Sequence, residues 1–124
     1  MLSTAAPKSR SGLSRHQEQL AADRASEQAW RALCRQVEQR DRRMCRVCHR
    51  SCHLSGKGKW KADAHHLVFR SVGGRDELNN VILLCRSCHD DIHVHGVLAV
   101  SGYGDLRLFV ERLVDGQWID QGER

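Results

Sequence analysis

The 124-residue sequence is poor in aromatic residues and in long apolar segments. It has three Trp, two Phe and one Tyr. Its longest apolar runs extend over only about four residues, as at 81–84, whereas a membrane-spanning helix needs about 20 apolar residues. One proline and ten glycines, with 40% hydrophobic and 28% charged residues, indicate a globular chain rather than a collagenous or disordered one. This length predicts a single domain, and so small a core predicts a stabilising crosslink or metal ion.

The first ten residues also lack the apolar segment that marks a secreted protein. We therefore expect a cytoplasmic protein with no membrane association. In that compartment the six cysteines are expected to bind metal rather than to form disulfides.

Charge is distributed unevenly along the chain. Residues 1–61 contain 14 Lys and Arg against five Asp and Glu, and residues 62–124 contain six against ten. A basic half beside a half that is rich in histidine indicates a surface for a polyanion next to a site of chemistry. The alternative is that the basic residues only keep the protein soluble.

The expected fold class is α+β. Residues 1–13 are expected to form a flexible tail. Residues 14–43 contain no Gly or Pro, Ser14 and Gln17 fit a capping box, and Trp30, Leu33 and Val37 share one helical face. They predict a basic N-terminal helix, or two.

Residues 44–96 are expected to form the compact part of the protein. A strand at 64–69, a second strand at 81–84 and a short helix from Ser87, its N-cap, to His95 follow in that order, with Gly96 ending the helix. Residues 97–124 are expected to form a terminal hairpin or two short strands.

Two C-x-x-C motifs, Cys45 with Cys48 and Cys85 with Cys88, are separated by 36 residues. Each motif lets two thiolates reach one ion, and two motifs complete a tetrahedral zinc shell. A structural zinc ion at this place would stabilise a domain with a thin core.

Other interpretations of the cysteines are weaker. Histidine follows both motifs, as in covalent haem attachment, but that reaction requires export. A disulfide framework conflicts with the expected compartment, and a redox dithiol would need only one motif. Cys34 is expected to be a buried apolar residue. Further potential zinc ligands near the first motif are Cys52, His49 and His53.

Four histidines form a second pattern. His89 and His93 are four residues apart on the expected short helix, so both project from one face, as two ligands of one ion must. His65 and His66 lie at the start of the first expected strand, and Asn80 lies at the start of the second. We interpret His16, His53 and His95 as ordinary core or surface residues.

These residues resemble the HNH, or ββα-metal, endonuclease family over about residues 40–96. The likeness is carried by residues 64–74 (AHHLVFRSVGG), Asn80 and residues 84–93 (LCRSCHDDIH), and an R-D-x-x-x-C-x-x-C segment upstream is typical of zinc-containing members. The paired histidines followed by a pair four apart are closest to the branch that includes the colicin nucleases. The resemblance implies a small ββα-metal domain with a structural zinc knuckle.

The resemblance also implies a role for each residue of the pattern. His66 is the general base, and His65, His89 and His93 hold one divalent cation against the scissile phosphate. Asn80 braces the loop between the strands and helps to orient His66. Many family members have Asp where this chain has His65, which changes the expected metal preference but retains a ligand.

The chemistry of the residues agrees with those roles. Histidine has a reference pKa of about 6.5 and suits proton removal from water at neutral pH. A cation held by imidazoles acts as a Lewis acid on a phosphodiester. We expect Zn in the cysteine site and Mg, Mn, Ni, Co or Zn in the histidine site.

The sequence therefore predicts a metal-dependent endonuclease that nicks duplex DNA with low sequence specificity. We expect it to be a monomer or a weak homodimer, with DNA as partner and a phage or bacterial protein as a potential guide of cleavage. The alternative is a non-catalytic zinc module that binds nucleic acid, and RNA is a third potential substrate. The residues expected to contact phosphates are Arg43, Arg46, Lys57, Lys59, Lys61 and Arg70.

Overall fold

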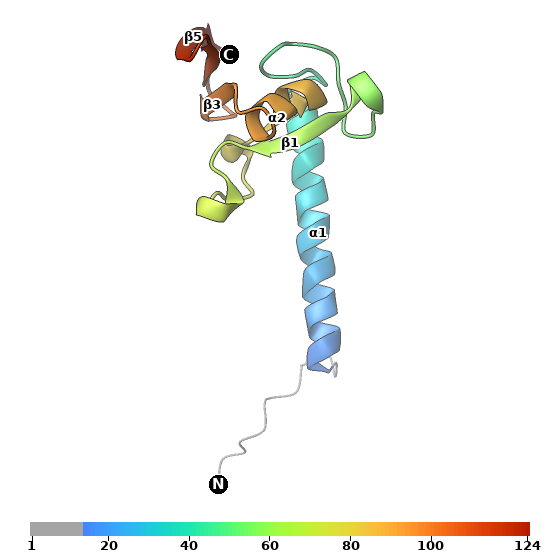
Figure 1. Cartoon of the computed structure of the whole chain (residues 1–124). Coiled ribbons are helices and arrows are strands. Elements are labelled where there is room, and N and C mark those ends of the chain that lie inside the picture. Colours follow the sequence, from blue (N-terminus) through green and yellow to red (C-terminus); the bar gives the residue numbers. More distant parts are fainter. Residues whose placement is uncertain (1–13) are drawn as a thin grey trace. The chain divides into compact units, whose positions relative to one another are not determined.

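The computed structural model describes residues 14–124, and the expected tail at 1–13 lies outside them (Figure 1). The chain divides into two compact units, which meet along the sequence between Ala32 and Leu33. The fold of residues 14–124 is α+β, with helices and two small antiparallel sheets. No helix in the described part of the chain is both long enough and apolar enough to span a membrane.

Helix α1 (Arg15–Arg40) begins with the capping box expected from the sequence. The Ser14 N–H donates to Gln17 Oε1 over 2.9 Å, and the Gln17 N–H donates to Ser14 Oγ over 3.2 Å. The helix ends before the expected residue 43, because Arg42 and Arg43 adopt left-handed backbone angles, with φ of 57° and 53°.

The first sheet pairs β1 (Ala62–His66) with β2 (Val81–Cys85), and α2 (Arg86–His93) follows directly. The order strand, strand, helix is the expected one. Strand β1 starts and ends earlier than expected, because the chain after His66 turns into a 3₁₀ turn, η2 (Arg70–Val72). Strand β2 is buried along its whole length, so it forms the centre of the core.

The N-cap of α2 is Cys85, and the expectation that Ser87 caps this helix is wrong. The Cys88 N–H donates to Cys85 Sγ over 3.4 Å. The sulfur thereby takes the place of the usual hydroxyl or carboxylate acceptor, and the helix can start at the end of the strand. The helix also ends earlier than expected, at His93, with Val94 as its C-cap.

The C-terminal segment forms a three-stranded sheet instead of a hairpin or two strands. Strands β3 (Leu98–Gly102), β4 (Leu108–Val114) and β5 (Gln117–Glu123) are antiparallel in that order. Asp115 and Gly116 join β4 to β5 with φ of 49° and 78°. Two consecutive left-handed residues are what a tight hairpin turn requires, and an Asp-Gly pair meets that requirement.

A buried carboxylate, that of Asp41, links the end of α1 to the core. It accepts hydrogen bonds from the side chains of Arg40 and Arg46 and from the Leu83 N–H at 2.9 Å. Arg46 also donates to the carbonyl oxygen of Gly104 over 2.6 Å. Because β2 and the C-terminal segment share this network, it fixes the loop that carries the first cysteine motif.

Candidate metal centres

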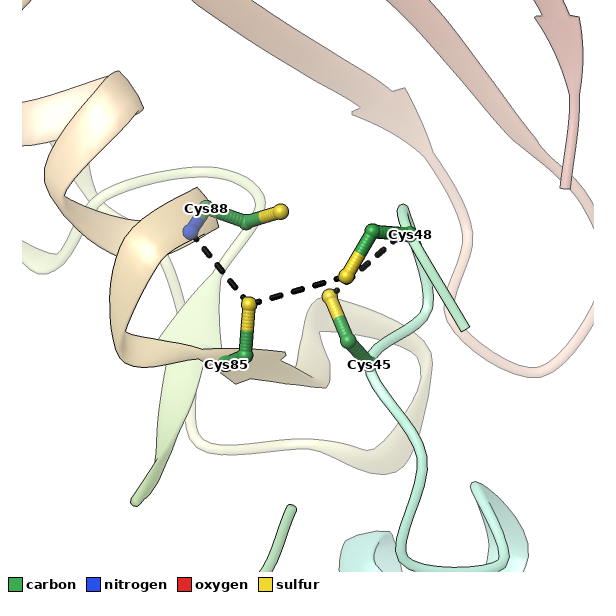
Figure 2. Close-up of side chains that lie close together, drawn as sticks. All are labelled: Cys45, Cys48, Cys85 and Cys88. Atoms are coloured by element: carbon green, nitrogen blue, oxygen red, sulfur yellow. Dashed lines mark hydrogen bonds between the residues drawn. The ribbon is translucent and has the colours of Figure 1, made fainter. Parts of the chain in front are cut away.

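The four cysteines of the two C-x-x-C motifs come together in one cluster (Figure 2). Cys45 and Cys48 lie in the loop after α1, Cys85 ends β2, and Cys88 lies in α2. Their sulfur atoms lie within 4.8 Å of one another, and Cys48 Sγ is 3.7 Å from Cys85 Sγ. Zn–S bonds of about 2.3 Å in a tetrahedron place neighbouring sulfurs roughly 3.8 Å apart, so this donor set could hold a structural zinc ion.

The electrostatics of the cluster also fit a cation. The side-chain hydrogen bond from Cys88 lowers the pKa of the Cys45 thiol to about 4. The same bond raises the pKa of Cys88, and burial raises that of Cys85. One buried thiolate therefore opposes the ionisation of its neighbours, and a dication would remove that opposition.

The remaining cysteines lie outside this cluster. Cys52 is fully buried, and burial together with its negative neighbours raises its pKa to about 12, so it remains a thiol. His49 is exposed with φ of 63°, and Nδ1 of His53 lies 3.2 Å from Ser55 Oγ. None of these three belongs to a ligand cluster among the described residues. Cys34 is only partly buried, which differs from its expected place in the core.

A second cluster unites His65 of β1 with His89 and His93 of α2. One ring nitrogen from each lies within 4.8 Å of those of the other two. Nε2 of His93 is 3.2 Å from Nδ1 of His65, and the His89 and His93 ring centroids are 4.5 Å apart. The two helical positions share a face because they are four residues apart, and β1 places His65 opposite that face.

Burial favours the neutral form of two of these imidazoles, those of His65 and His89. It lowers the pKa of His65 to about 3, with further lowering from His93, His89 and His66, and it also lowers the pKa of His89. A metal ligand must present an unprotonated nitrogen. The cluster therefore suits a divalent cation that accepts imidazole ligands, such as Zn, Ni or Co.

Asp63 approaches His89 from β1. Its Oδ2 lies 3.7 Å from His89 Nδ1, and this oxygen is a buried polar atom with no hydrogen-bond partner. Its Oδ1 accepts from the Arg86 guanidinium at 3.1 Å. Metal-ligating histidines almost always donate their second N–H to a carboxylate, a backbone carbonyl oxygen or a water molecule. The orphaned oxygen is placed to accept that bond when His89 uses Nε2 as a ligand.

His66 lies beside the three-histidine cluster and contacts a different carboxylate. Its Nε2 lies 2.7 Å from Asp76 Oδ1, and Arg70 donates to both Asp76 oxygens over 3.0 Å. The bidentate hydrogen bonds from Arg70, reinforced by His66, lower the pKa of Asp76. His66 and the three-histidine cluster line one cavity of about 170 Å³. Its lining residues are His65, His66, Phe69, Arg70, His89 and His93.

Asn80 fixes the loop that carries these groups. Its side chain accepts from the Val68 N–H at 2.8 Å and donates to the carbonyl oxygens of Val68 and Arg75 at 3.0 Å each. It therefore spans the loop from both sides, although the structure records no hydrogen bond between the Asn80 and His66 side chains.

The basic residues expected to contact phosphates are not all available for that role. The Arg46 side chain is 15% exposed and held by Asp41, and Lys61 Nζ donates to the Leu54 carbonyl oxygen. Arg43 is exposed but pairs with Glu38 at 3.3 Å. Lys57 and Lys59 are exposed on the loop, and Lys59 lies over the Trp60 ring at 5.1 Å.

Comparison with known proteins agrees with this geometry. Residues 45–95 match the model of the HNH endonuclease family, and this range contains both clusters, His66, Asp76 and Asn80. We therefore refer to residues 45–95, the part of the chain that matches this family model, as the HNH domain. Its two C-x-x-C motifs and its histidines are consistent with a zinc-containing HNH domain.

One relative is similar to a short segment of the chain. A segment of 42 residues is 38% identical to anaredoxin from Nostoc sp., covering 34% of this chain and 55% of that protein. The chain thus spans about half the length of this relative. No solved structure is significantly similar to the chain.

Sequence reasoning missed two carboxylates of the HNH domain, Asp63 and Asp76. Asp63 precedes His65 by two residues, so strand alternation places the two side chains on one face and could have indicated it. Asp76 lies in an irregular loop, ten residues after His66. Its contact follows from the path of that loop, which no periodic pattern encodes.

Proposed function

We propose that the HNH domain is a metal-dependent endonuclease that hydrolyses phosphodiester bonds in DNA, nicking the duplex with low sequence specificity. The observation that carries this proposal is one cavity of about 170 Å³ in which the three-histidine cluster adjoins His66 and Arg70. Such a cavity combines a cation site, a candidate base and a positive charge for a phosphate.

The residues have separate tasks in this proposal. His65, His89 and His93 would hold a divalent cation, which would supply Lewis-acid stabilisation of the negative charge that develops at the phosphate. His66 accepts the proton of the attacking water, and Arg70 contacts a phosphate oxygen through its guanidinium. Asn80 holds the loop so that His66 and Arg70 stay at the rim of the cavity.

The test is conversion of supercoiled plasmid to nicked circles by the wild type, His66→Ala and His95→Ala. Each protein receives Mg, Mn, Ni, Co or Zn, with EDTA as control. We expect metal-dependent nicking by the wild type and by His95→Ala, and a loss of at least about 100-fold in His66→Ala, as for removal of a general base. Undiminished cutting by His66→Ala would remove His66 as the base.

A second candidate is a non-catalytic zinc module that binds nucleic acid, favoured by exposed Lys57 and Lys59 beside the half-exposed Trp60. The two functions differ in metal stoichiometry. The module needs only the cysteine site, whereas the nuclease needs a second and weaker site at the histidines. One bound metal per chain, with DNA retarded on a gel but never cut, would favour the module.

A further inference from the structure

Asp76 occupies an unusual position between the two side chains at the rim of the cavity. One of its oxygens, Oδ1, lies 2.7 Å from His66 Nε2 and accepts from Arg70 Nε at 3.0 Å, while Oδ2 accepts from the Arg70 guanidinium at 3.0 Å. The carboxylate thus fixes two groups that the proposed reaction needs, at separations typical of charge-assisted hydrogen bonds.

The contact with Asp76 determines which nitrogen of His66 is basic. A carboxylate only accepts hydrogen bonds, so His66 must present Nε2 as N–H toward it. A neutral imidazole carries one proton, and with that proton on Nε2 the basic lone pair is on Nδ1. An Asp partner that holds an imidazole in one tautomer and stabilises the imidazolium formed later serves the same purpose in serine hydrolases.

We propose that Asp76 is a positioning residue that holds His66 in the Nε2–H tautomer, so that Nδ1 accepts the proton of the attacking water. The proposal rests on the nuclease function proposed above, and it adds a group that acts on the base rather than on the substrate. Arg70 keeps the carboxylate ionised and aligned, since it donates to both of its oxygens.

If Asp76 had a purely structural role, its removal would lower the folding stability of the protein. The Asp76 and Arg70 side chains are 43% and 56% exposed, and exposed ion pairs contribute little to folding stability. Removing the carboxylate should therefore leave the fold and the cysteine-bound zinc in place. A change confined to His66 and to the rate of cleavage would be the signature of positioning.

The variants are Asp76→Asn, Asp76→Glu and Glu77→Gln. Asparagine can donate to Nε2 and so favours the other tautomer, while glutamate retains a carboxylate. Glu77 is the neighbouring acid, which pairs with Arg75 at 3.8 Å; its substitution removes the same charge without touching His66.

The first measurement is the ¹⁵N spectrum of the histidine rings in the zinc-loaded full chain at about pH 8, where an ordinary imidazole is neutral. His66→Ala identifies the His66 signals. We expect the Nε2–H tautomer in the wild type, in Asp76→Glu and in Glu77→Gln, and a shift toward Nδ1–H in Asp76→Asn. The same tautomer distribution in the wild type and Asp76→Asn would overturn the proposal.

The second measurement is steady-state nicking with the metal that supports the wild type. We expect kcat of Asp76→Asn to fall by at least about 10–100-fold, the range known for partners that orient metal-ligating histidines, with KM changed less than kcat. Asp76→Glu should recover part of the loss, and Glu77→Gln should retain the wild-type rate. An unchanged kcat in Asp76→Asn would also overturn the positioning role. If the wild type cuts no DNA but the tautomer shift occurs, the nuclease proposal fails while the contact between Asp76 and His66 stands.

Discussion

Asp63 and Asp76 each face one histidine of the HNH domain, and the two contacts have different consequences. Asp76 lies against His66, which is not in the three-histidine cluster, whereas Asp63 approaches His89, which is. The side chain of Asp63 is 19% exposed, and its Oδ2 has no hydrogen-bond partner. A buried carboxylate oxygen without a donor is destabilising, so its presence is best explained by an interaction that forms when His89 binds a cation.

Replacing Asp63 by alanine should weaken divalent-cation binding at the histidine site about 10–100-fold, because His89 loses the acceptor that orients its ring. Zinc in the cysteine site should be unaffected. Calorimetric titration of the zinc-loaded protein with Co or Mn measures the effect, and Asp105→Ala, which removes an exposed carboxylate between β3 and β4, is the matched control. Equal affinity in the wild type and Asp63→Ala would limit Asp63 to its ion pair with Arg86.

Among single residues, the sequence predicts the metal ligands whose spacing in a helix or motif indicates that they meet at one ion. His89 and His93 follow from helical periodicity, and the cysteine motifs from ligand spacing. The contact of Asp63 with His89 depends on how β1 packs against α2, and the burial of Arg46 depends on Asp41 and on a carbonyl 58 residues away. Neither contact is encoded by a local pattern, although strand alternation does place Asp63 on the same face of β1 as His65.

The segment between β1 and β2 is an irregular loop with a defined path. The Asn80 side chain forms hydrogen bonds with the backbone N–H and carbonyl oxygen of Val68 within this loop. Gly74 lies directly against the Val68 carbonyl oxygen. A Cβ at Gly74 would lie 1.6 Å from that oxygen. The glycine is therefore required by the close approach of two backbone segments.

Gly74→Ala should displace this loop and lower the nicking rate by on the order of 100-fold, since shifts of about 1 Å in reacting groups have effects of that size. Zinc content should persist, because no cysteine lies in the loop. The control is Gly73→Asn: Gly73 has φ of 93° with open space around its Cα, and asparagine tolerates left-handed angles better than alanine. Nicking rates and zinc content of both variants, measured together, decide the matter; a fully active Gly74→Ala would show that the loop path is not needed for the chemistry.

The elements were predictable where periodicity or turn chemistry is strong. The capping box at Ser14 and the order strand, strand, helix agree with the structure. The start of α2 was not predictable, because a cysteine sulfur replaces the expected Ser87 cap. The C-terminal segment has one strand more than expected, and β5 is hard to recognise because all its residues are exposed, so the alternation that marks a half-buried strand is absent.

Across the unit formed by Leu33–Arg124, distant segments meet at the cysteine cluster and at Asp41. The cluster joins the loop after α1 to β2 and α2, and Arg124 donates to the Val47 carbonyl oxygen over 3.0 Å. Among residues 14–124, the largest fully buried side chains are few; they are aliphatic apart from three cysteines, and none is aromatic. A core of this size needs a further source of stability, and a structural zinc ion supplies binding free energy that is folding free energy.

Cys48→Ser separates zinc from ordinary packing. Cys48 is exposed, and substitutions at exposed sites without special contacts change stability by about 0.5 kcal/mol or less. If four sulfurs hold a zinc ion, its loss or weakening should instead lower Tm by at least about 15 °C, at roughly 4–8 °C per kcal/mol for a domain of this size. The Tm of Cys48→Ser, measured by calorimetry, and its zinc content should therefore fall together. Wild-type protein treated with a chelator should behave similarly.

Cys34→Ser is the matched control, since Cys34 is a free cysteine outside the cluster. The histidine cluster depends on the same fold, because α2 begins at Cys85 and carries both His89 and His93. Loss of zinc should therefore abolish nicking even when Mg or Mn is supplied in excess. A Cys48→Ser protein that melts at the wild-type temperature and still cuts DNA would mean that the cysteine cluster does not support the nuclease site.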